Sequence, residues 1–115
     1  MRLDHVQVSC PPGGEDVARA FYRDSLGMTE LDKPPLLAVR GGCWFKDGPA
    51  EVHVGVEENF SPALKAHPAL AVDDLDALAE TLLAKGYPVN WDNETIPGRR
   101  RFHTADGHGN RVEIV

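Results

Sequence analysis

The feature that most constrains the fold is a pattern that occurs twice within 115 residues. Each occurrence opens with a short apolar strand carrying a histidine, continues with a helix closed by glycine, and ends with a strand of alternating β-branched residues. The first covers about residues 1–58 and the second about 66–115, with Ser61-Pro62 marking the connection. A chain of this length buries one core, so we predict a single domain over residues 1–115 built from two modules.

Two segments have the periodicity of amphipathic helices. The first is predicted over residues 15–26 and is followed by Gly27. In the second, apolar residues recur at intervals of three and four positions, namely Leu75, Leu78, Ala79, Leu82 and Leu83. Asp73 and Asp74 precede this second helix as capping and negatively charged residues, and Gly86 follows it where a left-handed cap is expected.

The remaining segments are predicted to form eight short strands separated by turn residues. We expect them at residues 3–8, 28–32, within 36–46, and at 51–56, 66–72, 88–92, 100–105 and 110–115. The order is therefore strand, helix and three strands, repeated once. This order indicates an α+β fold.

Four residues with ligand chemistry lie on one face of these strands. Because side chains alternate along a strand, the valines of residues 51–56 share one face and His53 lies on the other. The same alternation places His5, His67 and Glu113 opposite the apolar rows of their own strands. The apolar rows are expected to pack under the helices, which leaves the polar face free for chemistry.

The spacing of these four residues favours a metal site. His5 precedes His53 by almost the same interval as His67 precedes Glu113, so each module supplies one candidate from its first strand and one from its last. Imidazole and carboxylate groups bind divalent first-row metals, and two histidines with one carboxylate leave positions open for catalysis. A single strand histidine is more often an ordinary hydrogen-bonded residue, but four candidates at equivalent places favour a site.

Composition excludes several classes of function. The net charge of −6 argues against sequence-independent binding of nucleic acid. No apolar run approaches the ~20 residues that span a bilayer, and the first residues lack a secretory signal, so we expect no membrane partner and a cytoplasmic location. Cys10 and Cys43 are predicted to be free thiols in a reducing compartment. The run at residues 99–101 is either a solvated loop or a clamp for an anionic substrate group.

Four stretches carry motifs of wider meaning: residues 3–6 (LDHV), 20–28 (AFYRDSLGM), 67–75 (HPALAVDDL) and 106–113 (DGHGNRVE). The last is similar to a closing Asp-Pro-x-Gly-Asn-x-x-Glu motif, with Gly107 in place of the proline, a change expected to alter only the turn. Together the four stretches resemble the glyoxalase, bleomycin-resistance and dioxygenase superfamily, also called vicinal oxygen chelate proteins.

The resemblance implies paired βαβββ modules that form a cupped, eight-stranded mixed sheet, a half-barrel with the helices outside. It also implies a homodimer whose clefts are often built from modules of both chains. His5, His67 and Glu113 match the usual three metal ligands, and His53 stands where glyoxalase I carries a metal-binding glutamate. The implied cofactor is one divalent ion, such as Zn, Ni, Mn, Co or Fe.

The resemblance predicts an enzyme that binds oxygens of a small-molecule substrate to the metal: an isomerase or lyase, a thiol transferase that opens an epoxide antibiotic, or a dioxygenase. The alternative is a non-catalytic protein that sequesters a drug or small molecule in the same cleft. Glu113 and His53 are the predicted catalytic residues. The predicted substrate-binding residues are Gln7, Trp44, Arg101, His103 and Arg111.

Overall fold

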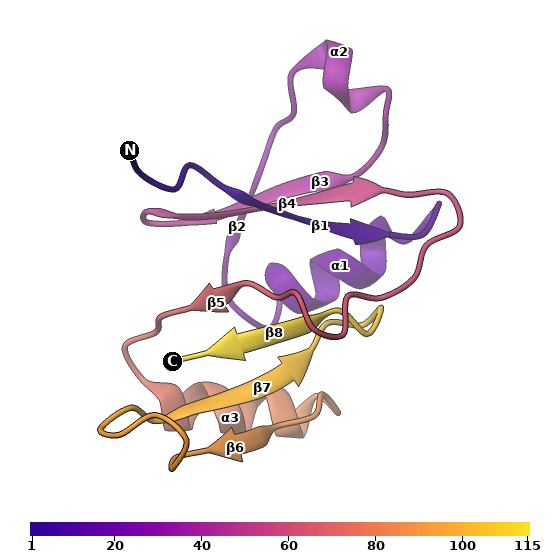
Figure 1. Cartoon of the computed structure of the whole chain (residues 1–115). Helices are drawn as coiled ribbons and strands as arrows, with labels where there is room; N and C mark the ends of the chain where they lie inside the picture. The colour runs from indigo at the N-terminus through magenta and orange to yellow at the C-terminus, as the bar shows by residue number, and fades with distance from the viewer.

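The computed structural model describes residues 1–115 and contains three helices and eight strands (Figure 1). In chain order they are β1 (Val6–Cys10), α1 (Glu15–Tyr22), β2 (Thr29–Leu31), α2 (Pro35–Ala38), β3 (Cys43–Asp47), β4 (Ala50–Val56), β5 (Ala69–Leu70), α3 (Leu75–Ala84), β6 (Asn90–Asp92), β7 (Arg101–Ala105) and β8 (Arg111–Ile114). The α+β class and the repeated strand order are confirmed. None of the three helices has the length and apolar character needed to traverse a bilayer.

The eight strands form two sheets with the same topology. Sheet one has the order β1-β4-β3-β2 and sheet two the order β5-β8-β7-β6. In each sheet the first strand pairs in parallel with the last, and the other neighbours are antiparallel. Within one chain β1 and β5 are both edge strands, so the two sheets are not joined by a ladder of hydrogen bonds.

Several element bounds differ from those predicted, for local reasons. Helix α1 ends at Tyr22, and the chain then continues in turns to Gly27, which has a left-handed φ of 80°. In residues 36–46 the predicted strand begins only at Cys43, because Pro34-Pro35 starts the short helix α2. Strand β5 has only two residues, since Pro68 has no N–H to donate to a ladder.

The predicted ends of helix α3 are confirmed. The carboxylate of Asp74 accepts a hydrogen bond from the backbone N–H of Ala77 at 3.0 Å, which caps the first turn. Gly86 has a φ of 88°, and the N–H of Tyr87 returns to the carbonyl of Leu82. The capping residues therefore fix where the chain leaves this helix.

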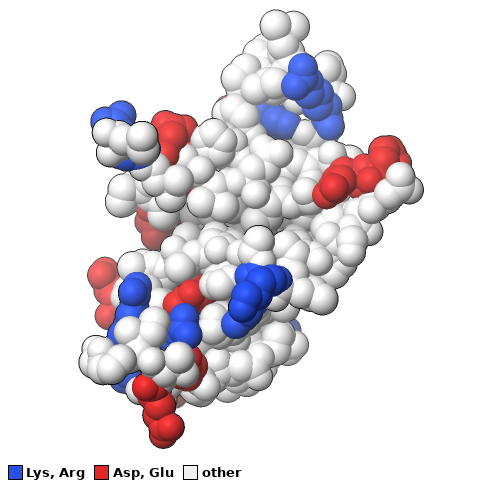
Figure 2. Space-filling view, viewed as in Figure 1, with Lys and Arg blue, Asp and Glu red and all other residues white.

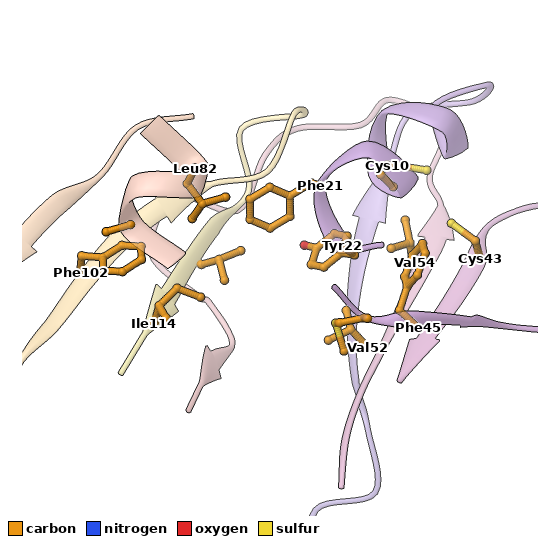
Figure 3. Close-up of a cluster of buried hydrophobic side chains, with 14 residues drawn as sticks. Cys10, Phe21, Tyr22, Cys43, Phe45, Val52, Val54, Leu82, Phe102 and Ile114 are labelled. Carbon is orange, nitrogen blue, oxygen red and sulfur yellow. The ribbon is translucent and has the colours of Figure 1, made fainter. Parts of the chain in front are cut away.

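The core extends across both modules, and helix α1 connects its two parts. The alternating residues Val52, Val54, Val112 and Ile114 are buried as predicted. Figure 3 shows Phe21 and Tyr22 between Leu82 of α3 and Phe45 of β3. Phe21 contacts Tyr87 edge-on at 5.1 Å, whereas Tyr22 stacks on Phe45 at 5.6 Å. Adjacent residues of one helix thus pack against different modules.

A buried carboxylate adds a polar connection between the modules. Asp106 accepts hydrogen bonds from the hydroxyl of Tyr22, the side chain and backbone N–H of Asn110, and the backbone N–H of His108. Burial, with Asp106 beside it, raises the pKa of Tyr22, so the hydroxyl stays protonated as a donor. Asn110 also donates to the carbonyl of Ser9 in β1. The DGHGN segment thus holds β8 against the first module.

Gly107 in this segment is matched to helix α1. A Cβ at position 107 would lie 2.4 Å from Cγ1 of Val17, and its φ is not in the left-handed region. The glycine is therefore required by the neighbouring valine and not by the turn itself. His108 completes the contact by donating to the carbonyl of Gly14 at 2.7 Å.

We expect Gly107→Ala to lower the free energy of unfolding by about 1 kcal/mol, because the new methyl group overpacks against Val17. The double variant Val17→Ala/Gly107→Ala should recover most of that loss, since it removes the clashing methyl group. Urea denaturation of the wild type, both single variants and the double variant measures the coupling. Additive losses would mean that Val17 is not the obstacle.

Candidate metal centre

Sheet two brings three potential metal ligands together. His67, His103 and Glu113 each present one ligand atom, and these atoms lie within 4.8 Å of one another. His103 is the cross-strand partner of Glu113 in the β7–β8 ladder, and His67 lies just before β5, the other neighbour of β8. No other set of three or more histidine, cysteine or acidic residues in the chain has this geometry.

The hydrogen bonds of His67 leave its second nitrogen facing an acceptor. Nδ1 donates to the carbonyl of Lys65 at 2.7 Å, so in a neutral imidazole Nε2 carries a lone pair. That Nε2 lies 3.0 Å from Oε2 of Glu113, which is also an acceptor when ionised. A second proton on the ring or a cation between the two atoms is needed to satisfy this contact. Fixing one ring nitrogen on a carbonyl while the other is free is typical of a metal-binding histidine.

Glu113 is held ionised by its neighbours. Its Oε1 accepts from Arg101 at 3.0 Å, and Arg101 also donates to Asp92 through two nitrogens. Burial by itself would raise the pKa of Glu113, but His67, which donates to it when the ring is protonated, and Arg101 together outweigh burial and lower the pKa. The pKa of Asp92 is likewise lowered, first by the backbone N–H of Thr95 and then by Arg101. Oε2 of Glu113 thus faces the histidines as a charged oxygen.

His103 supplies an unpartnered nitrogen. Its Nε2 is buried, has no hydrogen-bond partner and lies 3.9 Å from Oε2 of Glu113. Burial and the nearby charge of Arg111 lower the pKa of His103, which favours the neutral ring. Arg111 itself forms no ion pair and lines a 340 Å³ hollow beside His103. A buried orphan nitrogen next to a carboxylate fits a ligand position better than a structural one.

Sheet one carries a second group, made of stacked rings. His53 lies between His5 and Trp44, with ring centroids 4.0 Å apart on both sides. Nε2 of His53 donates to Glu51 at 2.9 Å, and Nδ1 of His5 donates to Asp4 at 2.8 Å. Nε2 of His5 makes no hydrogen bond within the chain.

The four ligands predicted from the sequence therefore fall into two pairs within one chain. His67 and Glu113 are in direct contact on sheet two, and His5 and His53 are stacked on sheet one. Neither His5 nor His53 belongs to the cluster on sheet two. Each module thus presents half of the predicted set.

Comparison with known proteins gives the context for this arrangement. The family model of the Glyoxalase/Bleomycin resistance protein/Dioxygenase superfamily matches residues 2–114. This chain belongs to that superfamily. No curated protein matches the sequence.

Solved structures of the superfamily share the fold. A glyoxalase family protein from Bacillus anthracis is 47% identical, with a TM-score of 0.94 over 99% of this chain and 93% of that one. The fosfomycin resistance protein FosX from Listeria monocytogenes is 13% identical, with a TM-score of 0.78 over 99% and 91% of the chains. TnmS3, an antibiotic binding protein from Streptomyces sp. CB03234, is 23% identical, with a TM-score of 0.73 over 99% and 96%. The last two similarities concern the fold alone.

Other residues singled out from the sequence have varied surroundings. Gln7 is exposed, with its amide over Gly55. In the basic run, Arg100 pairs with Asp76 and lies over Trp91, while Arg101 binds Asp92 and Glu113. Two of the three arginines are thus neutralised internally, which disfavours the anion clamp at this place.

The remaining aromatic and cysteine residues belong mainly to the core. Phe45 and Phe102 are fully buried, whereas Trp44 is half-buried and Trp91 is exposed. Cys10 and Cys43 are free, as predicted, and both are buried. Burial raises the pKa of Cys43 to about 11, so this thiol is a packing group.

Some residues of the centre were not identified from the sequence. His103 was expected to line a substrate pocket, and its place in the ligand cluster depends on the register that pairs it with Glu113. Asp92 and the carbonyl of Lys65 act by holding other residues, and they carry no motif. Glu51 had a usable signal, since it shares a strand face with His53.

In the metal-free protein we expect Arg101→Met to raise the pKa of Glu113, because a charged donor to Oε1 is lost. The wild-type carboxylate, with its lowered pKa, contributes stability above the ordinary value of 4.5, which is lost as the pH falls through the folded-state pKa. The variant should therefore lose less stability on acidification. Carboxyl ¹³C NMR titration measures the pKa, and Arg100→Met, which removes a surface pair, is the control. An unchanged Glu113 titration in Arg101→Met would refute the assigned role.

Proposed function

We propose that this protein is a metal-dependent enzyme of the superfamily that binds two oxygens of a small-molecule substrate to one divalent ion. The observation that carries the proposal is the 3.0 Å contact between Nε2 of His67 and Oε2 of Glu113, beside the orphan Nε2 of His103. Both atoms of this contact are acceptors when the His67 ring is neutral and the Glu113 carboxyl is ionised. The reaction is of the isomerase or lyase, thiol transferase or dioxygenase type.

The donor set fits a divalent first-row ion. Two imidazole nitrogens and one carboxylate oxygen are ligands that Zn, Ni, Mn, Co and Fe accept, and three protein ligands leave positions for substrate. When bound, such an ion supplies Lewis-acid stabilisation of negative charge that develops on substrate oxygens.

The residues around the cluster have separate roles. The Lys65 carbonyl orients His67, and Arg101 fixes one oxygen of Glu113 while the other faces the histidines. Glu113 is placed to accept a proton from substrate, as a carboxylate base whose ionised form is maintained by its neighbours. Arg111 and Gln7 carry hydrogen-bond donors without protein acceptors and would orient substrate oxygens.

We further propose that a second copy of the chain completes the centre with His5, and with His53 as an additional ligand or base. Two features support this proposal. The edges of β1 and β5 are unpaired, and a cleft of 590 Å³ lies between the two strands. Residues of the first strand, the β3–β4 hairpin and β5 line this cleft, and ten of its 18 residues are hydrophobic. An apolar cleft between unpaired edges suits burial by another chain.

Metal titration tests the proposed centre. We expect the wild type to bind one divalent ion per chain, and His67→Ala and Glu113→Ala each to lower the affinity at least tenfold, because each removes a ligand. His108→Ala removes an imidazole bound to a backbone carbonyl outside the cluster and is the control. Elemental analysis and calorimetric titration provide the measurement. A folded protein that takes up no metal under any loading would instead support a non-catalytic binding function.

Mixing two variants that each lack one proposed ligand tests whether a second copy contributes to the centre. If His5 serves a centre in the partner chain, a mixed dimer of His5→Ala and His67→Ala has one centre with both lesions and one intact. Unfolding and refolding the two together should then restore about a quarter of the wild-type metal content, because half of the dimers are mixed and each has one intact centre of two. Each variant refolded alone is the control. If the metal content is not restored, all ligands of a centre come from one chain.

A further inference from the structure

The segment around helix α2 encloses a small pocket on sheet one. Figure 1 shows α2 projecting above β3 at the top of the molecule, and a pocket of 210 Å³ lies between this segment and the sheet. The sheet side is formed by Gln7, Trp44 and Gly55. Trp44 also stacks on His53. The pocket therefore adjoins the sheet-one half of the proposed centre.

Two cations line this pocket and have no acidic partner. Lys33 and Arg40 both contribute to its wall, neither forms an ion pair, and no aspartate or glutamate lines it. Figure 2 shows blue surface beside α2, one of several blue areas on this face of the molecule. Glu15, whose Oε2 lies 3.7 Å from the Cβ position of Gly41, is outside the lining. The pocket therefore carries two unpaired positive charges, although the chain has a net charge of −6.

The backbone of the segment holds Lys33 and is itself fixed on the sheet. Lys33 donates to the carbonyl of Gly41, which closes the segment and leaves two ammonium protons free. Gly41 and Gly42 have φ values of 73° and 82°, and a Cβ at position 42 would lie 2.2 Å from the carbonyl oxygen of Val54. Only glycine permits this close approach, so the segment is anchored on β4.

We propose that Lys33 and Arg40, with the amide of Gln7, bind the anionic group of an organic substrate whose apolar part lies against Trp44. A guanidinium and an ammonium form strong charge-assisted hydrogen bonds with carboxylate, phosphate or phosphonate oxygens. The indole of Trp44 and the side chain of Leu37 supply the apolar wall. The inference rests on the proposed function, because it takes the ligand of this pocket to be part of the substrate.

Small aromatic probes test the pocket directly. Benzoate and phenylphosphonate carry the two headgroups, and benzamide is the uncharged analogue of similar shape. In a Trp91→Phe background, Trp44 is the remaining tryptophan, so its fluorescence reports binding at this place. We expect at least one of the anions to bind tenfold or more tightly than benzamide. The tighter of the two identifies the headgroup.

The double variant Lys33→Gln/Arg40→Gln should weaken anion binding at least tenfold and leave benzamide binding unchanged. The matched control is Arg2→Gln/Arg99→Gln, which removes the same charge from two exposed, unpaired arginines outside every pocket. It should change anion affinity less than twofold. Equal losses in both double variants, or anions that bind no better than benzamide, would overturn the proposal.

Metal binding measured on the same proteins separates this inference from the proposed function. Lys33→Gln/Arg40→Gln should bind the divalent ion as the wild type does. If the wild type takes up metal but binds neither anion, the anion site is refuted and the proposed metal-dependent function stands. If the protein binds no metal but binds anions through Lys33 and Arg40, the anion site stands and the metal-dependent function is refuted.

Discussion

The arrangement of the two modules depends on the hydrogen bonds that the carboxylate of Asp106 accepts. This residue lies 4% exposed, accepts four hydrogen bonds, and joins the hydroxyl of Tyr22 in helix α1 to the turn that starts β8. A buried charge is tolerated only when its hydrogen-bonding capacity is filled, so this cluster allows few alternative placements of the turn. Strand β8 begins five residues later and carries Glu113. The position of the candidate ligand is thus set by an interaction that takes no part in its chemistry.

The candidate metal centre is also organised by contacts outside its own chemistry. Two of the ligand side chains are oriented by other contacts: the Lys65 carbonyl holds His67, and Arg101, itself bound to Asp92, holds Glu113. The lone pairs and the negative charge that remain converge on one point, where only a cation or a proton can satisfy them. The order among these side chains is therefore preorganised for a positive ion.

The distribution of charge over the molecule follows from these pairings. Near sheet two, Arg100 and Arg101 are paired with carboxylates, whereas Lys33 and Arg40 beside α2 form no ion pair. The sequence has one conspicuous basic run at residues 99–101, yet the structure uses two of its members in internal ion pairs. Part of the free positive charge lies instead at Lys33 and Arg40, on a segment of mixed composition where neither residue stands out.

The sequence by itself determined the features that depend on local spacing. The alternation of valines defined the buried faces of β4 and β8, Asp74 and Gly86 fixed the ends of helix α3, and the repeat gave the order of strands. These are contacts between residues a few positions apart, or consequences of side chains alternating along a strand. The motifs also sufficed to identify the superfamily.

Only the tertiary structure decided which polar residues meet. The pairing of His103 with Glu113 depends on the register between β7 and β8, and the separation of His5 from His67 depends on how two sheets are placed around helix α1. Neither register nor sheet placement has a local signature, since both result from core packing and from hydrogen bonds between distant residues such as Tyr22 and Asp106. The sequence therefore indicated which residues have ligand chemistry, and the packing determined which of them lie together.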